Sequence, residues 1–531
     1  MYKNLFSVAA LTLLSRATGF VRDVMLAAVL GAGLNADAFV VAFRLPNHFR
    51  AIFGEGAFNA AYVPCYSQII TKHGLEAGRY FASQIFTLLL GSQIVLLILA
   101  LIFMPQFIDL LAPGFRADPQ KFSLAVTLTR ITFPYLLFIT LVTLQSGTLN
   151  ALEHFTAAAF APVLLNVVMI LFLAVAFLFP SAGVAAAIGV TVSGVAQFLL
   201  TFFALHRMGL HEHLVPHVWD AEVKHFFLVL GPAVIGAAGA QIALFADTII
   251  GSMLPTGGVS SIYYADRIYQ LPIGVVGIAA GTVLLPEMAR RLAGGDEAGA
   301  YYAQNRTMAL SVAIAAPCSV AFIMIPEIIM RGVFMRGAFT EADALAAAAV
   351  LTAYGFGIVP IVLIRSAVAS FQSVGDTRTP MFITLFAVAV NLGLKVLLFR
   401  PFGAAGLAAA TAIFAWINLL LLMAVATRRG LMRLDWVFGK SAAVTSVAAF
   451  LGAIFALLAA WPAAEFAASL PRFQNEIELV LLLIGGAIVY VLALGVGLYV
   501  SGVGPGLSTI LSQAQQFGLF GGLLRRFRSS H

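Results

Sequence analysis

Hydrophobic residues occur in runs of about 20 that repeat along the whole chain, separated by short polar breaks. A helix of that length crosses the hydrocarbon core of a bilayer, which is about 30 Å thick. Runs such as LFLAVAFLFP (171–180) are apolar throughout, whereas the strands of a membrane barrel alternate apolar and polar residues. The pattern therefore predicts an all-α polytopic membrane protein with about 14 transmembrane helices.

Composition supports this class and excludes a soluble domain. Of the 531 residues, 61% are hydrophobic and 10% are charged, with a mean hydropathy of +0.99, whereas about a quarter of the residues in soluble domains are charged. The two cysteines fit neither a metal nor a disulfide pattern, so we expect both to be small buried hydrophobes. Four histidines gather between residues 206 and 217, but without the fixed spacing of a zinc site.

The distribution of lysine and arginine predicts the orientation in the membrane. When the loops are assigned alternately from a cytoplasmic N-terminus, 16 of the 30 basic residues fall in cytoplasmic loops, 6 in external loops and 8 in or near helices. Basic residues concentrate in short cytoplasmic loops. We therefore expect both termini in the cytoplasm and a first helix that is retained rather than cleaved. The asymmetry also accounts for most of the net charge of +7, so we expect no nucleic acid partner.

Similar short segments recur at an offset of about 225 residues and indicate an internal duplication. RLPN (44–47) matches QLPI (270–273), and Asn166 followed by GVAAAIGV (183–190) matches Asn391 followed by GLAAATAI (406–413). We expect two pseudo-symmetric six-helix lobes, residues 1–218 and 219–435, which face each other across a central cleft. Residues 436–531 would add helices 13 and 14 and a basic cytoplasmic tail.

Charged residues interrupt several of the apolar segments. An ionised side chain in hydrocarbon costs at least about 2.5 kcal/mol, so such residues persist mainly where they face a polar interior and have a function. The first two helices contain Arg16, Arg22, Asp23, Asp37, Arg44, Arg50 and Glu55. The second lobe contains Asp247, Asp266, Arg267, Arg365 and Lys395.

Arginines outnumber lysines among these residues, which favours an anionic ligand. The guanidinium group matches phosphate oxygens two at a time, so the predicted cleft suits a phosphate or a pyrophosphate. We favour a binding function for Arg16, Arg22, Arg50 and Arg267, because so many cations exceed what helix pairing requires. The alternative is a structural role, in which the arginines only pair with carboxylates and hold helices together. For Arg130 and Arg365 we give the structural role and the binding role equal weight.

Proline and glycine mark expected hinges. Pro46 and Gly54 flank the charges of the second helix, and Pro272 occupies the matching place in the second lobe. Proline removes a helix hydrogen bond and glycine relaxes the backbone, so we expect kinks that permit alternating access.

Four segments resemble the MurJ (MviN) family of lipid II flippases, within the multidrug/oligosaccharidyl-lipid/polysaccharide exporter superfamily: LSRATGFVRD (14–23), IFGEGAFNAAYVP (52–64), LNALEHFTAAAFAPVLLN (149–166) and YYADRIYQLPIGVVGIAAGTVLLPEM (263–288). The resemblance covers essentially the whole chain. It implies a transporter of the inner membrane, not an enzyme, that moves the undecaprenyl-pyrophosphate-linked peptidoglycan precursor between leaflets. The expected partners are lipid II, membrane lipids and the cell-wall synthesis machinery.

The resemblance also implies which residues contact the substrate. The arginines essential in relatives would be Arg16, Arg22, Arg50 and Arg267, with Asp23 beside them and Arg44 where relatives carry a cation. Asp266 and Glu55 complete the expected substrate-binding set. The last two helices would form a groove for the lipid tail.

One position departs from the family pattern. Some relatives bind sodium between carboxylates of the helices that correspond to 227–253 and 381–399, but this chain offers Asp247 with Asn391 and Lys395. A lysine ammonium would replace the ion, so we expect no cofactor, no metal and no sodium coupling, with the membrane potential as the driving force.

Two other transporter functions remain open. A flippase for another isoprenoid-pyrophosphate-linked glycan would also bind an anionic lipid head, and only the EGAF and YYADR segments argue against it. A multidrug exporter of the same fold would need carboxylates rather than arginines in its cleft. An integral membrane enzyme is disfavoured, since the loops are short and carry no HExxH, DxD or nucleophile-elbow motif.

Overall fold

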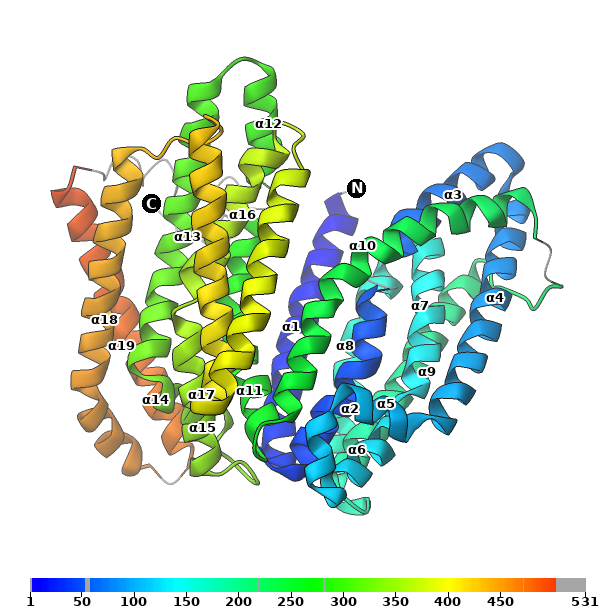
Figure 1. The fold of residues 1–531 in the computed structure, drawn as a ribbon, viewed down its shortest axis with the longest axis horizontal. Helices are drawn as coiled ribbons and strands as arrows, with labels where there is room; N and C mark the ends of the chain where they lie inside the picture. The colour runs from blue at the N-terminus through cyan, green and yellow to red at the C-terminus, as the bar shows by residue number, and fades with distance from the viewer. Residues whose placement is uncertain (1, 53–57, 217–218, 280–282, 471, 503–531) are drawn as a thin grey trace, which may run out of the picture. The chain divides into compact units, whose positions relative to one another are not determined.

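The computed structural model describes residues 2–52, 58–216, 219–279, 283–470 and 472–502. Within these ranges the regular structure is helical and contains no strand, which confirms the all-α prediction. The chain forms two compact units (Figure 1). Unit 1 comprises Met1–Tyr264 and Phe334–Asp343, and unit 2 comprises Ala265–Val333 and Ala344–His531.

Unit 1 is a bundle in which the most hydrophobic helices surround polar ones. Helix α1 packs along α8, α9 packs against α6, α7 and α8, and α10 packs against α2, α3 and α4. Its helices are α1 (Tyr2–Leu30), α2 (Leu34–Ile52), α3 (Phe58–His73), α4 (Leu75–Ile102), α5 (Met104–Leu111), η2 (Pro113–Ala117), α6 (Pro119–Thr132), α7 (Pro134–Ala151), α8 (Phe155–Ala174), η3 (Ala176–Leu178), α9 (Ala182–Arg207), α10 (Ala221–Ser252) and the start of α11 (Gly258–Ala279).

Local sequence signals explain where several of these helices begin. Asp118 accepts hydrogen bonds from the backbone of Gln120 and Lys121 at the start of α6, and Asp220 accepts one from Val223 at the start of α10. Such caps satisfy backbone N–H groups that the helix itself leaves unpaired. Between η2 and α10, Gly114 allows a close approach, since a Cβ there would overlap the carbonyl oxygen of Ser252.

Unit 2 contains the rest of α11 and eight further helices. These are α12 (Leu285–Ala293), α13 (Glu297–Met324), α14 (Pro326–Phe334), α15 (Glu341–Gly355), α16 (Ile358–Gln372), α17 (Arg378–Arg428), α18 (Trp436–Ala468) and α19 (Gln474–Val500). The first residues of α15 and the last of α14 belong to unit 1. Helix α17 consists of two helices joined at Gly403, whose φ of 55° and ψ of −134° are not helical.

The last two helices pack closely along each other in unit 2. A Cβ on Gly452 of α18 would lie 2.8 Å from the carbonyl oxygen of Gly486 of α19, so small residues permit this contact. The Tyr490 hydroxyl donates to the carbonyl of Ala313 at 2.6 Å and fastens α19 to α13. Many large apolar side chains of α18 and α19 are exposed, among them Leu458, Trp461 and Val491.

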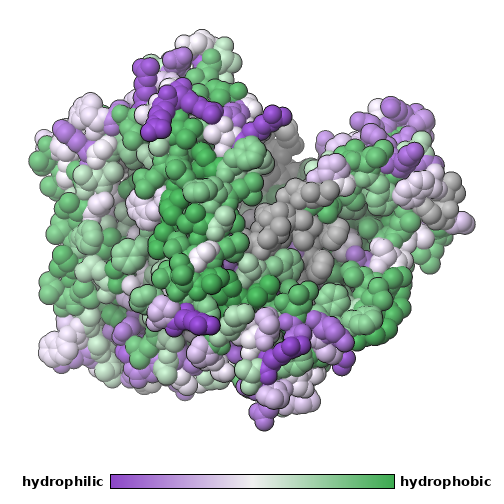
Figure 2. Space-filling view, viewed as in Figure 1, coloured by the Kyte–Doolittle hydropathy of each residue, from purple (hydrophilic) through white to green (hydrophobic). Residues whose placement is uncertain are grey.

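The apolar surface is that of a multi-pass membrane protein. Within the described residues, nine helices or joined helices are long and apolar enough to cross a membrane. On the face shown in Figure 2, hydrophobic side chains cover the middle of the helices of unit 2, and hydrophilic ones gather toward the helix ends. Large exposed apolar surfaces of this kind are stable only in contact with lipid. The count of about 14 spanning helices stays a prediction. So do the three predicted parts of the chain, residues 1–218, 219–435 and 436–531, because the two compact units reflect contacts in space and do not test a repeat in the sequence.

Candidate functional site

The Arg22 side chain in α1 is buried and tied to its neighbour. Only 7% of Arg22 and 3% of Asp23 are exposed. The Arg22 guanidinium donates to Asp23 Oδ1 through Nε at 3.0 Å and Nη2 at 2.7 Å. Arg22 therefore has an acidic partner on its own helix, and its binding role stays a prediction. A long arginine side chain folds back onto the next residue, although the two Cα atoms lie on different helix faces.

Asn166 of α8 holds the guanidinium from the other side. Its Oδ1 accepts from Arg22 Nη1 at 2.9 Å, while its Nδ2 donates to the Ser15 carbonyl at 2.9 Å and to Thr18 Oγ1 at 3.3 Å. A Cβ on Gly19 would lie 3.3 Å from Asn166 Nδ2, so glycine leaves room for the amide. Asn166 thus fixes the direction of the Arg22 side chain relative to α1.

Tyr263 of α11 completes this cluster. Its hydroxyl donates to Asp23 Oδ1 at 2.9 Å, and the Phe43 ring centroid lies 5.8 Å from Arg22 Cζ. An arginine held by several buried partners needs little reorganisation to meet an anion, which lowers the entropic cost of binding. We call Arg22, Asp23, Asn166 and Tyr263 the Arg22 cluster.

A second buried ion pair joins α2, α6 and α11. The Asp37 carboxylate accepts from Lys121 Nζ at 2.6 Å, from the backbone N–H groups of Gly257 and Ser260 at 2.8 Å each, and from Ser260 Oγ at 2.7 Å. Asp37 is 0% exposed and Lys121 is 3% exposed. A carboxylate at the N-terminus of a helix also opposes the positive end of the helix dipole. This pair therefore fastens the first turn of α11 to α2 and α6 within unit 1.

The other predicted residues of unit 1 lie in less enclosed places. Arg16 is exposed, whereas Arg44 and Arg50 are half-buried, and Arg50 Nε donates to Asn47 Oδ1 at 3.0 Å. Pro46 is buried inside α2, which continues to Ile52. Gly54 and Glu55 lie outside the described residues.

Asp266 and Arg267 lie in the part of α11 that belongs to unit 2. Both are half-buried, and Arg267 Nη2 lies 3.8 Å from Asp266 Oδ2. Gln270, one turn later, donates to the same carboxylate. Pro272 is buried within the helix, which continues to Ala279. Asp266 is therefore shared between an arginine and a neutral amide.

The residues of the expected ion or charge-pair site fall in different units. Asp247 is half-buried in α10 of unit 1. Asn391 and Lys395 are both buried on α17 of unit 2, one helical turn apart. Arg130 and Arg365 are exposed. For these two arginines the sequence favoured a binding role and a structural role equally.

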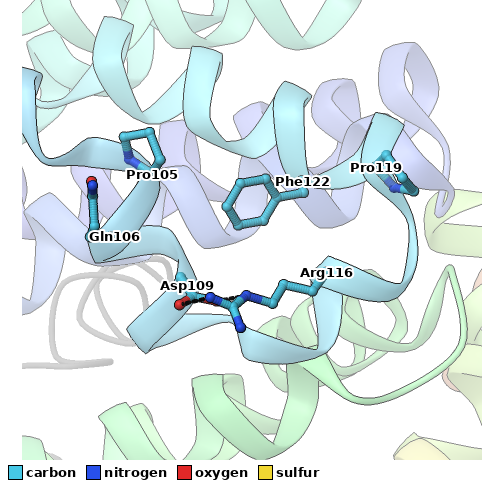
Figure 3. A pocket seen from close by; sticks show the side chains of 6 residues that line it. All are labelled: Pro105, Gln106, Asp109, Arg116, Pro119 and Phe122. Carbon is cyan, nitrogen blue, oxygen red and sulfur yellow. Dashed lines mark hydrogen bonds and ion pairs between the residues drawn. The ribbon is translucent and has the colours of Figure 1, made fainter.

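A surface cavity of about 430 Å³ lies between α5, η2 and α6 (Figure 3). Its lining residues are Pro105, Gln106, Asp109, Arg116, Pro119 and Phe122, and Arg116 forms an ion pair with Asp109. It contains none of the residues predicted to bind substrate. Among the residues that the structure describes, no group of three histidine, cysteine or carboxylate side chains could hold a metal ion.

Sequence reasoning missed three residues that organise these clusters. Asn166 served only as a landmark of the repeat, although a single amide inside the run PVLLNVVMI was a signal of a buried polar contact. Lys121 was assigned to an external loop, and Tyr263 entered only within a family motif. Their partners lie 84 and 240 positions away in the chain, so spacing alone does not reveal them.

Comparison with protein families gives one match over most of the chain. The family model described as "Lipid II flippase MurJ" matches residues 26–472. The "Probable lipid II flippase MurJ" of Rhizobium meliloti (strain 1021) is 37% identical over 504 residues, which cover 94% of each chain. The "Lipid II flippase MurJ" of Burkholderia cenocepacia is 34% identical over 439 residues, covering 81% of this chain and 84% of that protein.

Solved structures show the same fold. The structure titled "Lipid II flippase MurJ, inward closed conformation" superposes with a TM-score of 0.77 at 24% identity and covers 93% of this chain and 98% of that one. An inward-facing multidrug resistance MATE family transporter of the MOP superfamily gives a TM-score of 0.65 at 17% identity, covering 78% of this chain and 95% of that one. The fold is therefore that of this group of transporters.

Proposed function

Because this chain belongs to the lipid II flippase MurJ family, we propose that it moves lipid II from the cytoplasmic to the periplasmic leaflet of the bacterial inner membrane. Lipid II is the undecaprenyl-pyrophosphate-linked disaccharide-pentapeptide from which peptidoglycan is made. The observation that carries the proposal is the family match over residues 26–472. The Arg22 cluster adds a guanidinium that Asn166 of α8 contacts directly and whose partner Asp23 accepts from Tyr263 of α11.

The proposal includes an arrangement in the membrane. About 14 helices span the bilayer, forming two six-helix lobes around a central cationic cleft and a final helix pair that contacts the lipid tail. Both termini lie in the cytoplasm. The excess of basic residues in the alternate loops supports this orientation, since 16 fall on the cytoplasmic side and 6 on the other.

The mechanism follows from the charge of the substrate. Arg16, Arg22, Arg50 and Arg267 bind the pyrophosphate while the cleft is open to the cytoplasm. The lobes then rock about Pro46, Gly54 and Pro272 and release the head group outside. The membrane potential, worth about 2.3 kcal/mol per elementary charge per 100 mV, resets the empty cationic carrier.

Sodium is not the coupling ion in this proposal. The ammonium of Lys395 occupies the place of the ion and pairs with Asp247. The burial of Lys395, which is 3% exposed, supports this, since a buried ammonium requires a compensating charge. Transport by the purified protein should therefore be the same in sodium and in potassium buffers. A sodium requirement that disappears on changing Asp247 would contradict the proposal.

Leaflet accessibility of labelled lipid II tests the function in cells depleted of their own flippase. Expression of this chain should restore the label to the outer leaflet, and Arg267→Ala and Arg22→Lys should each abolish that signal. Lysine keeps the charge beside Asp23 but cannot make the two-fold contact of a guanidinium, so Arg22→Lys tests binding rather than folding. The matched control is Arg130→Ala, because Arg130 is exposed.

Two outcomes would overturn the proposal. One is normal lipid II translocation by both arginine variants at wild-type levels in the membrane. The other is translocation of a different isoprenoid-pyrophosphate-linked glycan with no effect on lipid II.

A further inference from the structure

The loop between α9 and α10 is fastened to α4 by backbone hydrogen bonds. The backbone N–H of His213 donates to Ser83 Oγ at 3.1 Å, and that of Val215 donates to Thr87 Oγ1 at 3.2 Å. Arg79 of α4 donates to the carbonyl of His211 at 3.4 Å. We call residues 208–216 the α9–α10 loop, and we call it seated when these contacts are made.

Glu212 is the charged residue of this loop that is buried, beside the buried apolar Leu210. It is 6% exposed, whereas its neighbour His213 is exposed. Glu212 Oε2 accepts from Gln145 Nε2 of α7 at 3.2 Å, and Thr201 of α9 donates to Gln145 Oε1 at 2.5 Å. Among the described residues, the other oxygen, Oε1, is buried without a hydrogen-bond partner. Its own backbone N–H and Gln145 are both neutral donors, and their effect on the pKa of the Glu212 carboxyl is smaller than that of burial, so the ionised form is poorly compensated.

The charged groups around Glu212 do not form an ion pair with it in the described part of the chain. Arg79 of α4 is directed to the loop backbone and to His213 Nε2. The other titratable or charged groups on the surrounding elements are Tyr62, Cys65, Tyr66, Lys72 and His73 of α3, Glu76 and Tyr80 of α4, Tyr135 of α7, His206 and Arg207 of α9, His211 and Asp220 beside the loop, and Glu222, Lys224 and His225 of α10. Burial raises the pKa of Glu212 to about 7.

His211, which lies between two other histidine rings, has the opposite dependence on pH. The ring centroids of His206 and His211 are 4.6 Å apart, and those of His211 and His213 are 4.5 Å apart. The Nδ1 atoms of His206 and His211 lie 3.3 Å from each other, so they share one proton and cannot both carry one. Arg79 also donates to His213 Nε2, which requires that nitrogen to be unprotonated. Burial and these neighbours lower the pKa of His211.

We propose that Glu212 is a proton-binding site that controls whether the α9–α10 loop is seated. The neutral acid is stable in its buried position beside Gln145. The ionised carboxylate is more stable in water, so ionisation favours release of the loop. Beyond the loop, Asp220 caps α10 and accepts from Gln84 Nε2 of α4 at 2.9 Å, so α4 contacts both the loop and the start of α10. This inference goes beyond the transport of lipid II and does not depend on it.

The direction of the effect follows from linkage. The pKa of Glu212 in the seated loop lies above its ordinary value of 4.5, so seating weakens as pH rises between 4.5 and about 7 and the loss is complete above that. Protonation of His211 acts in the opposite direction, because its pKa is lowered in the seated loop and seating therefore weakens as the pH falls below 6.5. The two groups oppose each other below about 6.5, and between 6.5 and about 7 only the loss from Glu212 remains.

Spin-label mobility tests this proposal in the purified full chain. A nitroxide on Leu214→Cys, a position that is 70% exposed, reports loop motion when Cys65 and Cys318 are replaced by alanine. The label should gain mobility as the pH rises between 4.5 and about 7. The difference between about 7 and 4.5 allows a change of up to about 300-fold in the ratio of seated to released loop.

Three variants decide whether Glu212 is responsible. Glu212→Gln should stay seated at alkaline pH and lose the transition, whereas Glu76→Gln, at a side chain that is 85% exposed, should keep it. Gln145→Met removes the donor that stabilises the ionised form, so it should move the midpoint upward. An unchanged midpoint in Glu212→Gln, a pH-independent wild type, or a downward shift in Gln145→Met would each overturn the proposal.

Discussion

Replacing Asp37 with alanine should destabilise unit 1 far more than replacing its partner Lys121 with methionine. Asp37→Ala leaves the Lys121 ammonium buried and without its carboxylate, and breaking a buried pair in this way costs about 3–5 kcal/mol. It also leaves the backbone N–H of Ser260 without its acceptor, at about 1–3 kcal/mol. The Phe115 ring, 4.4 Å from Lys121 Nζ, contacts the ammonium before and after the substitution and so offsets none of this loss. We expect a loss of about 4–8 kcal/mol.

The reverse substitution is milder for a structural reason. In Lys121→Met the Asp37 carboxylate keeps three donors from the start of α11, two of them backbone N–H groups at the positive end of the helix dipole. We expect a loss of about 1–2 kcal/mol, and methionine fills most of the volume of the lysine side chain.

Unfolding in mixed micelles of mild detergent and SDS, followed by circular dichroism, gives the free energies for a double-mutant cycle. The double variant Asp37→Ala/Lys121→Met should recover about 2–3 kcal/mol relative to the sum of the single losses, because no uncompensated charge is left buried. Equal losses for the two single variants, or a double variant whose loss equals their sum, would refute this reasoning.

Two further predictions concern side-chain placement and backbone contact. Asn166→Leu should reduce lipid II binding and complementation about as much as loss of Arg22, whereas Asn166→Asp, which keeps an acceptor for Arg22 Nη1, should retain most of both. A wild-type affinity in Asn166→Leu would refute this. Gly114→Ala should lower the thermal midpoint of the purified protein by several degrees, because its Cβ would overlap the backbone at Ser252. The control Gly91→Ala, with nothing within 4 Å, should leave the midpoint unchanged or raise it, and equal midpoints would contradict the packing argument.

The fold class followed from the sequence because hydrophobic run length is a local property. Each run specifies a helix without reference to the rest of the chain, so the all-α prediction needed no tertiary information. The break at Gly403 is also local, since its positive φ suits glycine. A second helix begins directly after Gly403. The proline and glycine of RPFG (400–403) indicate a break but do not show that no loop follows it.

The site was harder to predict because its contacts connect distant parts of the chain. Arg16 and Asp23 are seven positions apart, which puts them on one face of a helix, but the carboxylate of Asp23 accepts from Arg22 and Tyr263. Buried Glu212 was equally hidden, since a polar residue between two histidines in a loop is usually solvated. Its burial depends on Gln145, which lies 67 positions earlier.

The two buried ion pairs differ in how they arise during assembly in the membrane. Arg22 and Asp23 are sequence neighbours, so their pair forms as soon as α1 does, and the segment can partition into lipid with two opposite charges already neutralised. Asp37 and Lys121 reside on separate helices, and their pairing must wait until α2, α6 and the beginning of α11 have come together. The first pair thus lowers the cost of inserting a single helix, while the second stabilises the correct association of several helices.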